Sequence, residues 1–321
     1  MSTNQQSLLT RRHIRTKVMQ LLFANSEGEQ ANVVKAKSLL EDSLAGIYDY
    51  YLLQMSLLVA IHKKASRQLQ FYEQKHILQE REHKLCEDLV NNQILIHLVK
   101  NELVESEMSN KYIDLWKNHP EYVDLVFKSI WTDDFFNESL SSKKMEFEDD
   151  RVLVVSLFKN VIAPNEKLHD FLCDYKLTWD VDIPVVNTLF LKRLAKAKLP
   201  LAEDYFMVDL FNDSEDEKYA IDLLTKTILN GSAYQEEVAE KTENWDQERI
   251  AQLDMILLRM AICEFKEFPQ LPFKVTINEY IELAKEFSTP KSSTFINGIL
   301  DKIVKEYMSS NNLNKIGRGL L

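Results

Sequence analysis

Glycine and proline are scarce in this chain, which contains 6 Gly and 7 Pro among 321 residues. An all-β protein changes direction roughly every 8–12 residues and needs turn-forming residues at that spacing. This small number of turn-forming residues excludes an all-β architecture. Because 45% of the residues are hydrophobic, the chain can still bury a substantial core. These two properties together predict an all-α fold.

Cysteine is also rare, and the three cysteines, Cys86, Cys173 and Cys263, are far apart in the sequence. Without any C-x-x-C pair, the sequence suggests neither a disulfide framework nor a zinc knuckle. The N-terminus lacks a hydrophobic signal core. The most apolar window, Tyr50–Ile61, is too short to cross a bilayer. We therefore expect a cytoplasmic protein without a membrane partner.

The sequence lacks the common catalytic and nucleotide-binding motifs. It contains no G-x-G-x-x-G, no Walker loop, no H-E-x-x-H and no G-x-S-x-G. Most carboxylates recur at three- and four-residue spacing, which is typical of solvated helix faces. We therefore predict that the protein is not an enzyme, and that it has no catalytic residue, no metal site and no cofactor.

Charge is distributed unevenly along the chain. The net charge is −11, yet residues 1–20 carry four basic and no acidic residues, whereas residues 200–254 carry 15 acidic and 4 basic ones. A chain of this kind is not expected to coat nucleic acid, but it can present a small basic site to phosphates.

The first predicted helix runs from Thr10 to about Asn25 and begins with Arg11, Arg12 and Arg15. Cations in the first turns oppose the helix dipole, at a cost of roughly 0.3–1 kcal/mol each. Either solvent screening makes this cost small, or an anion offsets it. The basic helix start is therefore a solvated surface or an anion-binding site.

Two further helices are predicted in Pro272–Tyr307. Thr276 and Glu279 match a capping box, and Pro290 separates the two helices. Gly298 lies inside the second helix at a cost of about 1 kcal/mol relative to alanine, which suggests that something packs close to it. The apolar face of the first helix has helical spacing: Ile277, Tyr280, Ile281, Ala284 and Phe287.

A weak internal repeat precedes this region. Leu157–Ala195 aligns without gaps on Leu223–Ala261, with seven identical pairs among 39. Both copies contain Trp-Asp followed at the same distance by Leu-x-Arg-x-Ala. The alignment is either a chance match of amphipathic helices or a degenerate duplication. Between the copies, Leu199–Asp222 contains an apolar run that is predicted to pack as a helix, with Asn212–Glu217 as a loop.

The amino-acid sequences of several segments resemble those of the NusB family of transcription antitermination factors. The matching segments, which cover about a third of the chain, are P-F-K-V-T-I-N-E-Y-I-E-L-A-K-E-F, F-I-N-G-I-L-D-K-I, L-L-R-M-A-I-C-E-F and, near the N-terminus, R-R-H-I-R with Q-L-L-F. The resemblance implies the following organisation: a basic arm and helix at 1–25, a helical insertion at 26–200 with the degenerate repeat at 151–198, a NusB-like C-terminal helical domain at 201–308, and a flexible tail at 309–321.

By the same resemblance, the protein would bind RNA. NusB proteins are small helical factors that bind the single-stranded boxA element of nascent ribosomal transcripts together with NusE, a small-subunit ribosomal protein. The expected partners are a boxA-like RNA, NusE and the RNA polymerase antitermination complex. Matching positions imply these RNA-binding residues: Arg11, Arg12, Arg15, Phe23, Phe273, Lys291 and Phe295.

Two acidic residues, Asp254 and Glu264, match positions where the family helix contacts RNA or its protein partner. From its apolar surroundings alone, Glu264 is instead interpreted as a partly buried carboxylate paired with a nearby base such as Arg259. Both interpretations remain open at this point.

The sequence also departs from the family pattern. His13 interrupts the arginine motif, and Lys291 follows Pro290 where many members have an acidic residue. Some 190 residues separate the N-terminal helix from the C-terminal signature, and they could shield the site, add a contact or stabilise the fold. The alternative function is a non-enzymatic helical scaffold that works through protein contacts, with the acidic segment 200–254 as its docking face.

Overall fold

The computed structural model describes residues 7–24, 32–75, 80–108, 113–138, 146–242, 250–310, 315, 316 and 319. Over this part of the chain the regular structure is helical, with no strand, and the all-α prediction is confirmed. The chain divides into two compact units. Unit 1 comprises Met1–Leu8 and Ala45–Asp209, and unit 2 comprises Leu9–Leu44 and Leu210–Leu321.

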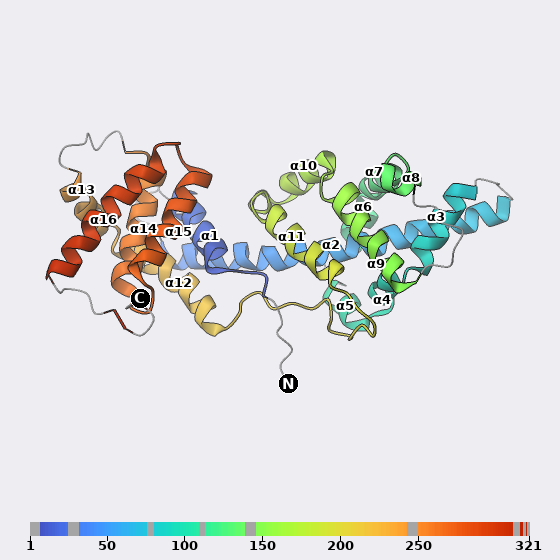
Figure 1. Cartoon of the computed structure of the whole chain (residues 1–321), viewed down its shortest axis with the longest axis horizontal. Helices are drawn as coiled ribbons and strands as arrows, with labels where there is room; N and C mark the ends of the chain where they lie inside the picture. Colours follow the sequence, from blue (N-terminus) through green and yellow to red (C-terminus); the bar gives the residue numbers. More distant parts are fainter. Residues whose placement is uncertain are drawn as a thin grey trace. The chain divides into compact units, whose positions relative to one another are not determined.

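Unit 2 is a helical bundle built around α14 (Gln252–Glu267) (Figure 1). Hydrophobic residues occur all around this helix, and most of its side chains from Asp254 to Phe265 are buried, as expected of a central helix. Its neighbours are helices from both ends of the sequence: α1 (Arg11–Ala24), α12 (Ser214–Leu229), α13 (Gly231–Lys241), α15 (Phe273–Phe287) and α16 (Ser292–Ser310).

The two helices predicted in Pro272–Tyr307 are present as α15 and α16, but two local predictions were wrong. The helix α15 begins at Phe273, three residues before Thr276, so Thr276 and Glu279 lie within the helix and form no capping box. Apart from the neighbouring backbone of the helix itself, no heavy atom of the described residues lies within 4 Å of the position that a Cβ at Gly298 would take. Nothing in the described part of the chain therefore packs against this glycine.

Unit 1 begins within the long helix α2 (Val33–Lys75) and consists of short helices packed around its apolar part. In chain order these are α3 (Glu80–Asn91), α4 (Gln93–Lys100), α5 (Glu102–Met108), α6 (Ile113–Asn118), α7 (Pro120–Ile130), α8 (Asp134–Glu138), α9 (Phe147–Ser156), the π-helix η1 (Leu157–Ile162), α10 (Glu166–Tyr175), the 3-10 helix η2 (Leu177–Trp179) and α11 (Asp182–Ala195).

Among the described residues, α2 alone is long and apolar enough to cross a membrane by length and composition. The prediction considered only the apolar window Tyr50–Ile61 and missed the length of the whole helix. However, 78% of the most apolar window is buried inside the protein. Burial of that extent is what the core helix of a folded domain shows, because its apolar side chains are already covered by protein.

The segment between the two copies is irregular as far as residue 213, which corrects the helix predicted over its apolar run, and α12 begins within the predicted loop, at Ser214. Residues 201–210 form turns and extended chain. Phe206 is nevertheless completely buried, and its carbonyl accepts a hydrogen bond from the Tyr51 hydroxyl at 3.0 Å. The apolar run therefore fills a core without forming a helix.

The helix order in the two copies is consistent with a duplication. Shifted by 66 residues, α9 with η1 falls on α12, α10 on α13, and α11 largely on α14. In the first copy Trp179 is buried, whereas Trp245 of the second copy lies outside the described residues. The duplication itself remains a proposal.

Candidate nucleic-acid interface

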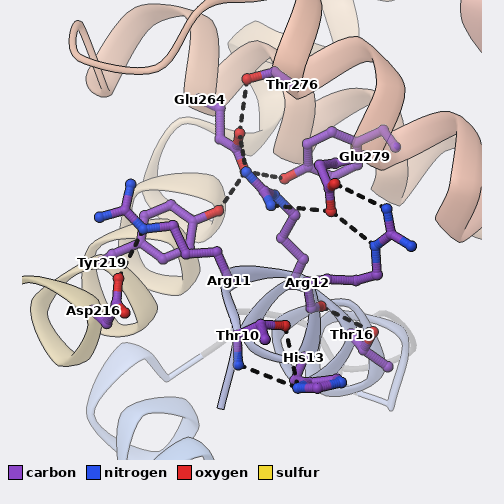
Figure 2. A network of polar contacts seen from close by, with 12 residues as sticks. Thr10, Arg11, Arg12, His13, Thr16, Asp216, Tyr219, Glu264, Thr276 and Glu279 are labelled. Atoms are coloured by element: carbon purple, nitrogen blue, oxygen red, sulfur yellow. Dashed lines mark hydrogen bonds and ion pairs between the residues drawn. The ribbon is translucent and has the colours of Figure 1, made fainter. Parts of the chain in front are cut away.

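The first turn of α1 is capped by an unusual residue. The backbone N–H of Thr10 donates to Nδ1 of His13 at 3.2 Å, so His13 takes the acceptor role that Glu or Gln has in a capping box (Figure 2). Burial, and then the positive charges of Arg12 and Lys17, lower the pKa of His13. The histidine within the arginine motif is therefore a neutral helix cap.

Arg15 lies in the core of unit 2 and is paired with Glu264 of α14. The guanidinium Nε and Nη2 donate to the two carboxylate oxygens at 2.7 and 3.0 Å, and the residues are 2% and 0% exposed. This bidentate geometry joins α1 to the centre of the bundle. It contradicts the expectation that Arg15 contacts a phosphate, because the guanidinium is covered by protein.

Glu264 is the centre of a buried polar network. Besides Arg15, it accepts hydrogen bonds from the hydroxyls of Tyr219 at 2.5 Å, Tyr280 at 2.9 Å and Thr276 at 2.9 Å (Figure 2). Burial opposes ionisation of Glu264, but the charge and hydrogen bonds of Arg15, together with both tyrosines, outweigh it, and the pKa of Glu264 is lowered. The carboxylate is therefore ionised and fully hydrogen-bonded.

This network decides between the two interpretations of Glu264. The residue is a buried carboxylate paired with a base, but the base is Arg15 and not Arg259. Burial lowers the pKa of Arg259, whose guanidinium lies against Gly231. Glu264 itself has no exposed surface, so a direct contact with a protein partner is excluded by its placement.

Arg11 and Arg12 remain at the surface, each held by a carboxylate from another helix (Figure 2). Arg11 Nε donates to Asp216 of α12 at 2.8 Å, and its side chain is 34% exposed. Arg12 forms two hydrogen bonds with Glu279 of α15, at 3.0 and 2.9 Å, and its side chain is 44% exposed. The unfavourable cations at the start of α1 are thus balanced by the protein's own acidic residues.

The three predicted aromatic residues lie in different surroundings. Phe23, near the end of α1, is 47% exposed. Phe295 on α16 is half-buried. Phe273, at the start of α15, is half-buried with its ring 5.1 Å from Phe265, and the amino group of Lys315 lies 4.6 Å from its ring centre. Phe273 therefore contributes to packing within unit 2.

Lys291 is exposed in the turn between α15 and α16, and Asp254 holds that turn in place. The Asp254 carboxylate accepts hydrogen bonds from the hydroxyls of Ser288 at 2.6 Å and Ser292 at 2.7 Å. At 5% exposure, Asp254 has almost no surface to offer a partner. Its placement indicates that it positions the neighbouring lysine.

The predicted residues do not form one cluster. Phe273 is the first residue of α15 and Lys291 lies beyond its last residue, and the 15 residues of this helix span about 22 Å. Arg12 contacts Glu279 near the middle of the same helix. The exposed groups are therefore arranged along α15, a layout that suits an extended ligand better than a compact one.

Sequence reasoning missed the residues that organise the arginines: Asp216, Tyr219, Glu279 and Tyr280. The signal for Glu279 was present but was interpreted as a helix cap, because a Thr-x-x-Glu pattern has the same appearance within a helix. Asp216 and Tyr219 carry no local signal, since their partners Arg11 and Arg15 are some 200 residues away in the sequence.

Comparison with known proteins places this bundle in a family. A sequence model of the NusB family matches residues 184–305. The transcription antitermination protein NusB of Salinibacter ruber is 40% identical over 114 residues, which cover 36% of this chain and 71% of that protein. The NusB proteins of Chloroherpeton thalassium and Geotalea uraniireducens are 35% and 41% identical over 42% and 28% of this chain, and 65% and 62% of their own lengths. No solved structure gives a significant match.

The fold and the site thus define an all-helical protein whose N-terminal arginines are built into a C-terminal helical bundle. The chain belongs to the NusB family. This membership confirms the prediction that the protein is not an enzyme.

Proposed function

We propose that the protein is a transcription antitermination factor that binds a boxA-like single-stranded RNA together with a NusE-like partner. The observation that carries the proposal is the presence of the family's bundle with Arg11 and Arg12 held at its surface by carboxylates from two other helices. The family model matches residues 184–305, which include Asp216 and Glu279, the partners of these two arginines. A cytoplasmic location and contact with the RNA polymerase antitermination complex are part of the same proposal.

Arg12 is well prepared to bind a phosphate. A guanidinium has five N–H groups, and the pair with Glu279 uses one on Nε and one on Nη2. Further N–H groups can donate to a phosphate while Glu279 keeps the side chain oriented. Because the orientation is set before binding, less side-chain entropy is lost when the RNA arrives.

Bases of an unstacked RNA need flat or apolar groups near these cations. Phe295 and Phe23 are the predicted aromatic residues with exposed surface on α16 and α1, and Lys291 adds a further exposed cation. Arg15 and Glu264 act indirectly, since they attach α1 to the bundle. We assign them a positioning role.

The test is fluorescence anisotropy of a labelled boxA-like RNA and a scrambled RNA across a salt series, with and without NusE. The variant is Arg11→Ala with Arg12→Ala. Each phosphate that a protein neutralises on a single strand contributes about 0.7 to the slope of log K against log salt, so the slope of the double variant should be shallower by roughly 1.4. Removal of two charge-assisted hydrogen bonds should weaken binding by roughly tenfold or more.

A matched control is Lys302→Ala with Lys305→Ala, which removes the same charge from exposed positions of α16. This control should keep most of the affinity and salt dependence. If the arginine variant binds the RNA as tightly as the wild type or the lysine control does, the proposed site is wrong.

One observation favours the alternative scaffold function. Both surface arginines already have carboxylate partners, so a phosphate has to compete with Asp216 and Glu279. A scaffold would show no RNA affinity at physiological salt, and it would be recovered in a stable protein complex in pull-down experiments. Salt-sensitive RNA binding that depends on Arg11 and Arg12 would exclude it.

A further inference from the structure

Three side chains of different chemistry meet in unit 1, outside the RNA site. His169 and Cys173 lie one turn apart on α10, and Asp180 directly follows η2. The Cys173 Sγ lies 3.9 Å from His169 Nε2 and 3.8 Å from Asp180 Oδ1, and His169 Nε2 lies 3.9 Å from the same carboxylate oxygen. These three atoms form a nearly equilateral triangle.

We propose that His169, Cys173 and Asp180 bind Zn²⁺. Zinc is bound by thiolate, imidazole and carboxylate at about 2.0–2.3 Å in tetrahedral geometry, which separates neighbouring ligand atoms by about 3.5 Å. The triangle has to contract by only a few tenths of an ångström. All three side chains are at least partly exposed, so small rotations can make that change.

The chemistry of the ligands selects among cations. A hard ion such as Mg²⁺ or Ca²⁺ prefers an all-oxygen shell, whereas the combination of sulfur, nitrogen and oxygen suits zinc. The local charge is negative as well. Asp170 and Asp174 directly follow the two ligands of α10 in the sequence. A bound dication would neutralise this crowding of acidic groups.

A metal here would attach the end of α10 to the turn before α11. That turn carries Trp179, which is 1% exposed and donates its indole N–H to the Gly46 carbonyl of α2 at 2.7 Å. The ion would therefore close a short loop around a residue that anchors the turn to the core helix. Three protein ligands leave the fourth tetrahedral position for water.

The structure provides a direct readout, because the other two cysteines, Cys86 and Cys263, are buried and Cys173 is not. A chelator first removes any bound metal from the full-length protein. The protein is then treated with a thiol-alkylating reagent, with and without stoichiometric Zn²⁺, and the labelled peptides are identified by mass spectrometry. Alkylation of Cys173 should be at least roughly tenfold slower with Zn²⁺, since a metal-bound thiolate is shielded from the reagent. Equilibrium dialysis should give one Zn²⁺ per chain.

His169→Ala and Asp180→Asn keep the thiol and should lose the protection. The matched control is His83→Ala, which removes a similarly exposed histidine of unit 1 that is paired with Glu87. It should be protected like the wild type. Co²⁺ in place of Zn²⁺ should show a thiolate charge-transfer band that disappears in Cys173→Ser. The proposal is overturned if Zn²⁺ leaves wild-type alkylation unchanged, or if His169→Ala is protected as well as the wild type.

Discussion

The buried pair of Arg15 and Glu264 makes a quantitative prediction about stability. Replacing Glu264 with Gln preserves its shape, so the substitution leaves no cavity but removes the charge that faces Arg15. Breaking a buried ion pair by neutralising one partner costs about 3–5 kcal/mol, because the other charge stays buried without compensation. Arg15 then keeps a longer ion pair, 3.4 Å from its Nη1 to Glu279, and its contacts with the rings of Tyr219 and Tyr280. We therefore expect Glu264→Gln to destabilise unit 2 by about 3 kcal/mol or more.

Unfolding of unit 2 is best followed separately, since a chain with two units need not unfold in one step. Hydrogen exchange of peptides from α14 and α15 under increasing urea reports the local free energy of unfolding. Glu267→Gln is the matched control on the same helix. Its pair with Lys226 is about one-third exposed on both sides, so the destabilisation should stay below about 1 kcal/mol.

A second substitution distinguishes a charge effect from a packing effect. Adding Arg15→Met to Glu264→Gln removes the uncompensated cation, while the amide oxygen still accepts from Tyr219 or Tyr280. The double variant should be more stable than Glu264→Gln alone, by about 1 kcal/mol or more. A destabilisation below about 1 kcal/mol for Glu264→Gln, or no recovery in the double variant, would refute this account of the network.

Two further predictions concern titration. The pKa of His13 is lowered in the folded state, so its contribution to stability is full above the unfolded pKa of about 6.5 and is lost as the pH falls through the lower folded pKa. His13→Gln keeps an acceptor for the Thr10 N–H and should therefore show a smaller loss of hydrogen-exchange protection in α1 between about pH 7 and pH 5. A loss equal to that of the wild type would contradict the capping role of His13. Burial lowers the pKa of Lys315 to about 8, so at about pH 9 its amine is mostly neutral. Lys315 should therefore be acetylated faster than the exposed Lys302, as measured by mass spectrometry. Equal labelling of the two lysines would show that Lys315 is not buried against Phe273 in solution.

Much of the fold could be predicted from local patterns. The helices α1, α15 and α16 follow from the spacing of apolar residues, because a surface helix must bury one face. The irregular segment around Phe206 could not be predicted in the same way, since its apolar run has no period that distinguishes a helix from a buried loop. Tertiary packing decides the conformation there.

The site was harder to predict because its organisation depends on contacts between distant residues. The sequence identified the arginines but could not separate Arg15, which is buried, from Arg12, which is exposed. The two differ only in which face of α1 they occupy relative to α14. The same limit applies to His169, Cys173 and Asp180, although the four-residue spacing of the first two was visible in the sequence.

The Arg15–Glu264 pair joins residues that are 249 positions apart in the sequence, so it fixes α1 to the bundle across a long intervening segment. Closing a flexible loop costs free energy that grows only with the logarithm of its length, so each doubling of the connection adds only about 0.6 kcal/mol. Breaking the buried pair would cost more than that, about 3–5 kcal/mol. The contacts of α1 with Glu264, Glu279 and Asp216 therefore oppose its release from the bundle. Hence Glu264→Gln should increase the hydrogen-exchange rate of α1 amides more than that of α16 amides. An equal increase in the two helices would argue that the residues between α1 and α12, and not the buried pair, hold the first helix in place.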